Sequence, residues 1–268
     1  MASPPPGSSA VPLSLTGLSV AYGERPAVRE LSLTVQPGEI YGLLGSNGAG
    51  KTSTIKAIVG LVRPAGGDIR VFGLDAVRDG LAVKARIGYV PETSMLYEAL
   101  TPREFLEIVA SIRQLDAGTA TRRLESYAQA FRLEGEVEEP IATLSNGTRQ
   151  KVLIIAALLH APPLLVLDEP LNSLDPRSVR IMKDVLQRYV ATGGRGVLFS
   201  THTMEVAEQL CQRVGILDRG VLKGEGSLGT LRARVAAGDA SLEEIFLRLT
   251  DEEVGVRAAV DTLGNASV

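Results

Sequence analysis

Cysteine is nearly absent from this chain, in which Cys211 is the one cysteine among 268 residues. A single cysteine cannot form a disulfide within the chain, so packing and hydrogen bonds must hold the fold together. This excludes the small disulfide-framed secreted proteins and fits a reducing compartment. We expect Cys211 to be a small buried apolar residue.

An excess of one charge and a long hydrophobic run are also missing. The 28 Lys and Arg against 31 Asp and Glu give a net charge of −3, and no basic block stands out, so no nucleic-acid partner is expected. The longest apolar stretch, Val152 to Leu167, is shorter than the about 20 residues that cross a bilayer. It is also interrupted by His160 and Pro162-Pro163. Any membrane attachment should therefore come from a partner.

The first residues lack the features of a secretory signal. Residues 1–12 contain neither a basic start nor an apolar run, and we expect a flexible tail there. The remaining chain, in a sequence that is 45% hydrophobic, is long enough for one large domain or for a core with a smaller subdomain.

Apolar patterning predicts strands and helices that alternate along the chain. Alternating or short apolar runs predict strands at Leu13–Val20, Leu31–Val35, Glu39–Leu44, Asp68–Phe72, Ile87–Val90, Leu164–Leu167 and Val197–Ser200. A hairpin is predicted from Val214 to Leu222 around Asp218-Arg219-Gly220. The first strands are of the half-buried antiparallel type, whereas those at 164–167 and 197–200 are of the buried parallel type.

Helical patterns fill much of the remainder. They lie after Lys51, at Val77–Ala85, from Thr101 through Ile112, at Thr119–Phe131 and at Leu242–Leu249. Thr101-Pro102-Arg103-Glu104 supplies a cap, a proline and an acidic first turn, so residues 101–139 look like a helical insertion. The last stretch, Val254 to Val268, receives no assignment. The pattern predicts an α/β fold.

A glycine-rich loop, Gly45-Ser46-Asn47-Gly48-Ala49-Gly50-Lys51-Thr52, stands between the strand at 39–44 and the helix that follows. Its glycines let the backbone N–H groups point inward, and the helix N-terminus adds partial positive charge. Lys51 would bind the β- and γ-phosphates, and the Thr52 hydroxyl is a suitable Mg²⁺ ligand. A nucleoside triphosphate is the expected ligand.

Two adjacent carboxylates, Asp168 and Glu169, end the apolar strand at 164–167. Charges at the end of a buried strand are costly unless they are used. Asp168 would hold Mg²⁺, and Glu169 would polarise the attacking water, because attack on a γ-phosphate needs a metal and a positioned water together.

Leu144-Ser145-Asn146-Gly147-Thr148-Arg149-Gln150-Lys151 resembles the signature sequence of ABC ATPases, usually LSGGQ followed by basic residues. The order of motifs also matches, with Ser173-Leu174-Asp175 and Phe199-Ser200-Thr201-His202 after the Asp-Glu strand. The resemblance covers roughly residues 13–225. It implies a P-loop NTPase core with a parallel sheet, an antiparallel β-subdomain, a helical subdomain at about 93–160, and a C-terminal extension at 226–268.

The resemblance also implies roles for single residues. Tyr22 would stack on adenine, His202 would contact the γ-phosphate, and Asp175 would lie in the loop that links two sites. Ser145 and Gly147 would bind ATP held by an opposite subunit in a head-to-tail dimer. The implied nucleotide contacts of the chain's own loop are Gly45, Ser46, Asn47, Gly48, Ala49, Gly50, Lys51, Thr52 and Thr54.

Two positions depart from the family pattern. Glu92 replaces a glutamine, and its carboxylate can still ligate Mg²⁺ while adding negative charge beside the phosphates. In the signature, Asn146 replaces a glycine and Thr148 a glutamine. Asn tolerates left-handed backbone angles, so we expect the loop to form.

The family resemblance implies the ATP-hydrolysing subunit of an ABC transporter, with ATP and Mg²⁺ as cofactors. Its partners would be a second copy or a paralogous ATPase subunit and an integral membrane permease, at the cytoplasmic face of the cell membrane. Tyr89–Glu92, Leu96-Tyr97 and Ser241–Leu247 are similar to drug-resistance and sodium-efflux ATPases, which favours an exporter. Met95, Leu96 and Tyr97 are candidate permease contacts.

The alternative is an ABC ATPase without a transporter, such as the single-cassette type of iron–sulfur assembly. The translation type carries two cassettes and the repair type a long coiled coil, and neither feature is in this sequence. A P-loop kinase or GTPase would not account for the signature or for His202.

Overall fold

The computed structural model describes residues 10–235 and 238–250. One of its two sheets is antiparallel, with strand order β2-β1-β4-β5. Its strands are β1 (Leu13–Tyr22), β2 (Arg25–Val35), β4 (Gly66–Val71) and β5 (Leu74–Asp75). The predicted antiparallel β-subdomain is therefore confirmed, with β2 beginning six residues before the predicted Leu31.

The second sheet is largely parallel and has the order β10-β9-β3-β8-β7-β6. Its strands are β3 (Glu39–Leu44), β6 (Ile87–Val90), β7 (Leu164–Asp168), β8 (Gly196–Thr201), β9 (Arg213–Asp218) and β10 (Val221–Gly226). Only β10 runs antiparallel, as the partner of β9 in the predicted hairpin. Each predicted strand of this sheet is present within one residue of its expected ends, except that β10 extends to Gly226, four residues past the predicted Leu222.

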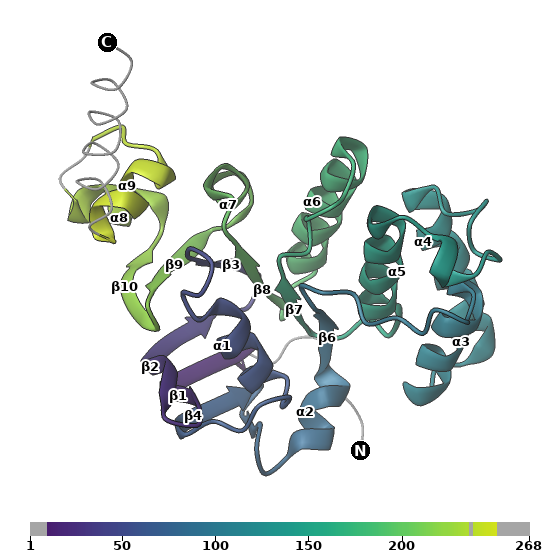
Figure 1. Ribbon diagram of the computed structural model, residues 1–268, viewed down its shortest axis with the longest axis horizontal. Coiled ribbons are helices and arrows are strands. Elements are labelled where there is room, and N and C mark those ends of the chain that lie inside the picture. The colour runs from purple at the N-terminus through teal and green to yellow at the C-terminus, as the bar shows by residue number, and fades with distance from the viewer. Residues whose placement is uncertain (1–9, 236–237, 251–268) are drawn as a thin grey trace.

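The central strands of this sheet are buried on both faces. Alternate side chains of a strand point to opposite faces, so Leu164 and Val166 enter a core shared with α1 (Lys51–Ile58) and the antiparallel sheet. Leu165 and Leu167 enter the core on the other face, which α5 (Asn146–Leu159) and α6 (Pro176–Ala191) cover. Helix α1 thus lies between the two sheets (Figure 1).

The helical insertion comprises α3 (Pro102–Ile112), α4 (Ala117–Phe131), the short 3-10 helix η1 (Ile141–Thr143) and α5 (Asn146–Leu159). Thr101 and Glu104 form the expected capping box at the start of α3. Leu106 and Phe131 share one core with Leu165 of the sheet, so the insertion has no separate core. Figure 1 shows it as the right-hand side of the molecule.

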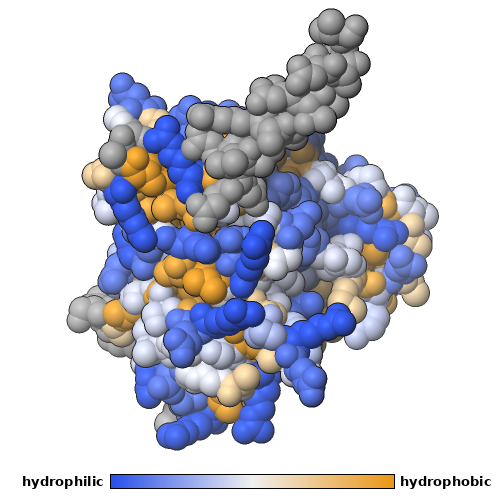
Figure 2. All heavy atoms as spheres, turned by 60° about the vertical axis from the view of Figure 1, so that its left-hand side comes forward, coloured by the Kyte–Doolittle hydropathy of each residue, from blue (hydrophilic) through white to orange (hydrophobic). Residues whose placement is uncertain are grey.

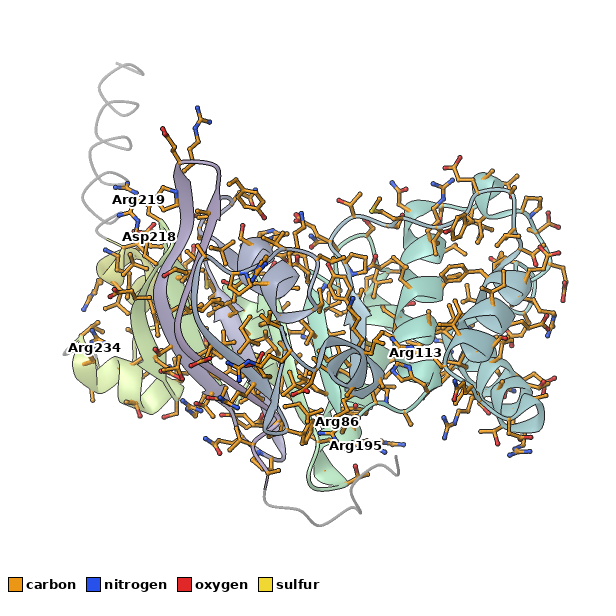
Figure 3. All side chains as sticks on the ribbon, turned by 90° about the horizontal axis from the view of Figure 1, so that it is seen from below. Arg86, Arg113, Arg195, Asp218, Arg219 and Arg234 are labelled. Atoms are coloured by element: carbon orange, nitrogen blue, oxygen red, sulfur yellow. The ribbon has the colours of Figure 1, made fainter. Side chains whose placement is uncertain are left out.

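Arg113, the C-cap of α3, ties this insertion to the sheet. Its guanidinium donates to the carbonyl of Lys84 in α2 (Gly80–Arg86) at 2.6 Å and to that of Ile87 in β6 at 3.3 Å. Burial lowers the pKa of Arg113 below its ordinary value. Its place at the junction is visible in Figure 3.

The remaining helices are α6 (Pro176–Ala191), α7 (Met204–Leu210), α8 (Leu228–Arg234) and α9 (Leu242–Leu249). Leu231, Ile245 and Phe246 of the C-terminal extension pack with Leu44 and Ile216 of the sheet. The face that carries α8, α9 and β10 is largely hydrophilic, with separate apolar areas (Figure 2). Among the described residues, no helix is both long enough and apolar enough to traverse a lipid bilayer.

At the N-terminal end of the described residues, the structure differs from the prediction. Pro12, predicted to lie in a flexible tail, is buried, and its carbonyl accepts a hydrogen bond from the Phe72 N–H at 3.2 Å. Residues 1–9 and the unassigned stretch 254–268 lie outside the described residues.

Cys211 is partly buried between two cores, and burial raises the pKa of its thiol to about 12.

Candidate functional site

The predicted phosphate-binding, metal-binding and catalytic residues gather at one edge of the parallel sheet. The glycine-rich loop follows β3, Glu92 follows β6, Glu169 follows β7 and His202 follows β8. The carboxyl ends of parallel strands meet at the same edge, where ligands of open α/β sheets bind. The strand register places Asp168 opposite Ser200, so the ends of β7 and β8 are level.

The loop between β3 and α1 encloses a hollow of about 200 Å³. The backbone turns through positive φ at Gly48 (83°) and Gly50 (109°), angles that side chains disfavour. A Cβ at Gly45 would lie 2.4 Å from the Leu217 carbonyl oxygen, so only glycine fits there. The loop with the start of α1 is a suitable cradle for phosphate oxygens.

Lys51 points into this loop. Its ammonium donates to the carbonyl oxygens of Gly45 at 2.7 Å and Ser46 at 3.3 Å, and it lies 3.5 Å from Oε1 of Glu169. The side chain is only 6% exposed. A cation held this way within the loop is placed to bind a phosphate that enters the hollow.

Asp168 is fully buried at the end of β7. Its Oδ1 accepts a hydrogen bond from the Ser200 hydroxyl at 2.6 Å. Burial raises the pKa of the Asp168 carboxyl, and the bond from Ser200 opposes that rise. Its Oδ2 is buried without a hydrogen-bond partner in the described part of the chain. An unpaired buried acceptor of this kind suits a cation.

Glu169 adopts a left-handed backbone with φ of 47°. Its N–H donates to the carbonyl and to the hydroxyl of Ser200, at 3.2 and 3.0 Å. Its Oε1 lies 3.0 Å from Nδ1 of His202, whereas Oε2 is buried and lacks a partner within residues 10–235 and 238–250. Glu169 therefore presents one held oxygen and one free acceptor.

Thr52 and Glu92 meet beside these carboxylates. The Thr52 hydroxyl donates to Oε2 of Glu92 at 3.2 Å, and the charge of Glu92 contributes to the raised pKa of Asp168. Hydroxyl and carboxylate oxygens are the ligands Mg²⁺ prefers. With the unpaired Oδ2 of Asp168, these residues fit a magnesium site.

The signature residues form the start of α5, and their backbone conformation differs from the one expected. Ser145 is the N-cap, and its hydroxyl accepts from the Thr148 N–H at 3.1 Å and lies 3.0 Å from the Thr148 hydroxyl. Asn146 is the first residue of the right-handed helix and does not have positive φ. The tolerance of asparagine for left-handed angles is therefore not what lets the loop form.

Eight predicted residues are not among those that line the hollow. Gly45, Thr54, Asp168 and His202 belong to the loop, to α1 and to the strand ends beside it. The other four, Tyr22, Ser145, Gly147 and Asp175, come from other parts of the chain. Tyr22, at the end of β1, is 49% exposed, and Asp175, the N-cap of α6, is 50% exposed. The roles of Ser145, Gly147 and Asp175 in a dimer stay predictions.

The prediction for Thr54 needs correction. Its N–H and its hydroxyl both donate to the Gly50 carbonyl, at 2.9 and 3.0 Å, and its side chain is fully buried. Successive helical residues turn by about 100°, so Ser53 faces the hollow instead. Sequence reasoning also missed Ser200, although a hydroxyl in the apolar strand 197–200 was a signal for it.

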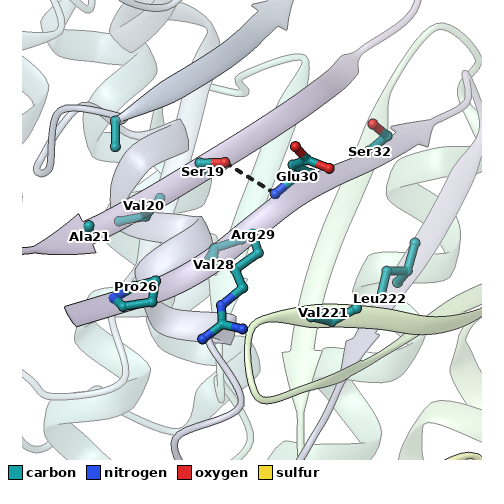
Figure 4. A pocket seen from close by; sticks show the side chains of 11 residues that line it. Ser19, Val20, Ala21, Pro26, Val28, Arg29, Glu30, Ser32, Val221 and Leu222 are labelled. Atoms are coloured by element: carbon teal, nitrogen blue, oxygen red, sulfur yellow. Dashed lines mark hydrogen bonds between the residues drawn. The ribbon is translucent and has the colours of Figure 1, made fainter. Parts of the chain in front are cut away.

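A larger hollow of about 800 Å³ shares no lining residue with the hollow beside this loop (Figure 4). It is formed by β1, β2 and β10, with Arg29 and Glu30 at its side and a hydrogen bond from the Glu30 N–H to the Ser19 hydroxyl at 3.1 Å. None of the predicted site residues lines it. The smaller hollow remains the candidate site.

Comparison with known proteins shows the family to which this chain is similar. A sequence model of the family described as ABC transporter matches residues 28–172. The ABC-type transporter ATP-binding protein EcsA of Bacillus subtilis (strain 168) is 37% identical over 91% of this chain and 98% of its own length. The daunorubicin resistance ATP-binding protein DrrA3 of Streptomyces coeruleorubidus is 35% identical, over 82% of this chain and 70% of that protein.

A solved structure of an ATP binding subunit of an ABC transporter also matches the fold. The two structures superpose with a TM-score of 0.85 at 36% sequence identity. The match covers 89% of this chain and 99% of the other.

Proposed function

The chain belongs to the ABC transporter family as an ATP-binding subunit with ATPase activity, and we propose that ATP is hydrolysed in the hollow beside Lys51. The observation that carries this proposal is that Oε1 of Glu169 lies within 3.5 Å of both the Lys51 ammonium and Nδ1 of His202. Hydrolysis needs a cation at the phosphates and a base at the water, and this arrangement supplies both.

In this mechanism the triphosphate takes over the hydrogen bonds of the loop. Lys51, now bonded to Gly45 and Ser46, turns its ammonium to the β- and γ-phosphates. The free Oε2 of Glu169 accepts a proton of the attacking water and orients it towards the γ-phosphorus. Water adds to phosphorus as the bond to the ADP oxygen breaks, and the products are ADP and inorganic phosphate.

Thr52, Glu92 and Asp168 are the residues that would hold Mg²⁺ with the nucleotide. Their oxygens fit the metal, and Oδ2 of Asp168 is the unpaired acceptor in the group. When bound, Mg²⁺ neutralises phosphate charge during the reaction. Ser200 fixes the Asp168 carboxylate by a 2.6 Å hydrogen bond and so orients it for this task.

We further propose that two such subunits work together with a membrane permease. Ser145 and Gly147 lie outside the hollow of their own chain, which supports their use by a second subunit. Met95 and Tyr97 are 85% and 71% exposed after Glu92, and we propose them as permease contacts at the cytoplasmic face of the membrane. A Met95→Ser/Tyr97→Ser variant that still copurified fully with the permease would contradict this.

The transporter is an exporter. One relative is named for daunorubicin resistance, and a resistance protein favours outward movement of a compound. The permease selects the transported substrate, so the sequence of this chain does not identify it.

The proposal is tested by ATP hydrolysis of the purified chain and of two lysine variants. Lys51→Ala should lose ATP affinity and activity, because the phosphates lose their cation. Lys56→Ala is a matched control, since Lys56 lies on the same helix but does not line the hollow. Equal activity of Lys51→Ala and Lys56→Ala would refute the proposed site.

A further inference from the structure

Three consecutive residues near the start of α5, Arg149, Gln150 and Lys151, connect this helix to two separate segments. On one side, Arg149 forms an ion pair with Glu98 at 3.2 Å. Its remaining guanidinium nitrogens donate to two carbonyls at η1, at 3.0 and 3.1 Å. These bonds fix the helix to η1 and to Glu98, which lies in the segment that follows Glu92.

On the other side, the next two residues contact the segment directly after Glu169. The Gln150 side chain is buried, and its amide donates to the Pro170 carbonyl at 3.1 Å. The Lys151 ammonium lies 3.1 Å from Oδ2 of Asp175 and is 14% exposed. Both ends of the segment 170–175 are thus held by α5.

The middle of this segment also approaches α5 closely. A Cβ at Gly147 would lie 2.6 Å from the Ser173 carbonyl oxygen, so the two backbones leave no room for a side chain. Ser173 has φ of 66° and Glu169 has φ of 47°, both in the left-handed region. Residues other than glycine keep such angles only where their surroundings hold them.

The partner of Lys151 is a carboxylate in a fixed position. Asp175 accepts the Ser178 hydroxyl at 2.6 Å and the Ser178 N–H at 2.9 Å as the cap of α6. These bonds, together with Lys151, hold the pKa of Asp175 well below its ordinary value. The lysine therefore binds an oriented carboxylate whose lowered pKa keeps it charged at neutral pH.

We infer that Gln150 and Lys151 are positioning residues for Glu169, acting through the segment 170–175. The inference rests on the proposed role of Glu169 in orienting the attacking water. Their contacts with this segment hold the backbone that leads from the left-handed Glu169 to the cap of α6.

The test compares ATP hydrolysis by the full chain, by Lys151→Met and by Lys151→Arg. Loss of the ammonium should lower kcat by about tenfold, with KM for ATP unchanged within about twofold, because a displaced base slows the chemical step. Lys151→Arg should restore kcat to within about threefold of wild type, since it retains the charge. Arg180→Met on α6 removes an exposed ion pair with Asp184 and is the matched control.

A second variant and a second readout separate positioning from other roles. Gln150→Met should lower kcat in the same way, and Lys151→Met in the Glu169→Gln background should still assemble with ATP. Unchanged kcat in both Lys151→Met and Gln150→Met would overturn the inference, as would an equal loss in Lys151→Met and Lys151→Arg. Loss of ATP-dependent assembly would also overturn it, by placing Lys151 at the second subunit's nucleotide. A wild-type chain without ATPase activity would instead refute the proposed function on which the inference rests.

Discussion

Nδ1 of His202 lies 3.0 Å from Oε1 of Glu169, and the two residues follow neighbouring strands, β8 and β7. Glu169 is 4% exposed and His202 is 48% exposed, so the imidazole reaches inward from the rim of the site. The contact fixes one carboxylate oxygen. The other oxygen is left for the attacking water.

Replacement of His202 by alanine should slow hydrolysis. Glu169 would lose the contact that orients it, and the γ-phosphate would lose a donor, so kcat should fall about 10- to 100-fold. ATP binding should change little, because Lys51 and the loop remain. Steady-state rates and a titration with labelled ATP measure both quantities. An unchanged kcat for His202→Ala would show that the contact has no catalytic part.

Asp168→Asn should stabilise the ligand-free protein while it abolishes hydrolysis. Burial raises the pKa of Asp168 in the folded state, so the unfolded chain releases this proton first as pH rises. Ionisation of the buried Asp168 carboxyl therefore lowers the free energy of unfolding. This loss begins near the ordinary carboxyl pKa and is complete above the raised pKa of the folded state. An amide of the same shape avoids this cost.

The measurement is Tm with and without the substitution at two pH values. At about pH 7.5 the variant should melt about 2–4 °C higher than wild type, and the difference should shrink towards about pH 4. Ser200→Ala is the informative comparison, because it removes the hydrogen bond to Asp168 and should lower Tm. A Tm of Asp168→Asn below that of wild type at neutral pH would contradict the assigned cost of burial.

Glu92 should make activity depend more steeply on Mg²⁺ concentration than glutamine would. Its carboxylate lies beside Thr52 and adds negative charge next to the phosphates, which the cation must offset. As Mg²⁺ is lowered at fixed ATP, the wild-type rate should fall earlier than that of Glu92→Gln. Superimposable Mg²⁺ titrations of the two proteins would count against this role.

Much of the fold could be predicted because its signals are local. Glu39–Leu44, Ile87–Val90 and Leu242–Leu249 have the predicted bounds, since apolar runs and caps define them within a few residues. No helix was predicted over Pro176–Ala191, although its buried residues recur at helical spacing. The buried position of Pro12 depends on contacts with Phe72 and Gly196, which no local pattern encodes.

In the candidate site, too, some residues are revealed by local sequence and others depend on how distant parts of the chain pack. The loop, Asp168 and Glu169 were found because their chemistry requires adjacent residues in a fixed order. The part played by Ser200 depends on strand register, which sets it opposite Asp168, and the pairing of Lys151 with Asp175 depends on how α5 packs beside α6. The choice of Thr54 in place of Ser53 was an error of helix phase.

The most direct test of this account measures ATP binding, hydrolysis and mass on one preparation of the Glu169→Gln chain. The variant should bind ATP with near wild-type affinity, hydrolyse it at least about 100-fold more slowly, and double its mass when ATP is present. Glu134→Gln, which changes an exposed glutamate outside the site, should match wild type in rate. Sustained turnover by Glu169→Gln would contradict the assignment of Glu169 as the residue that orients the attacking water.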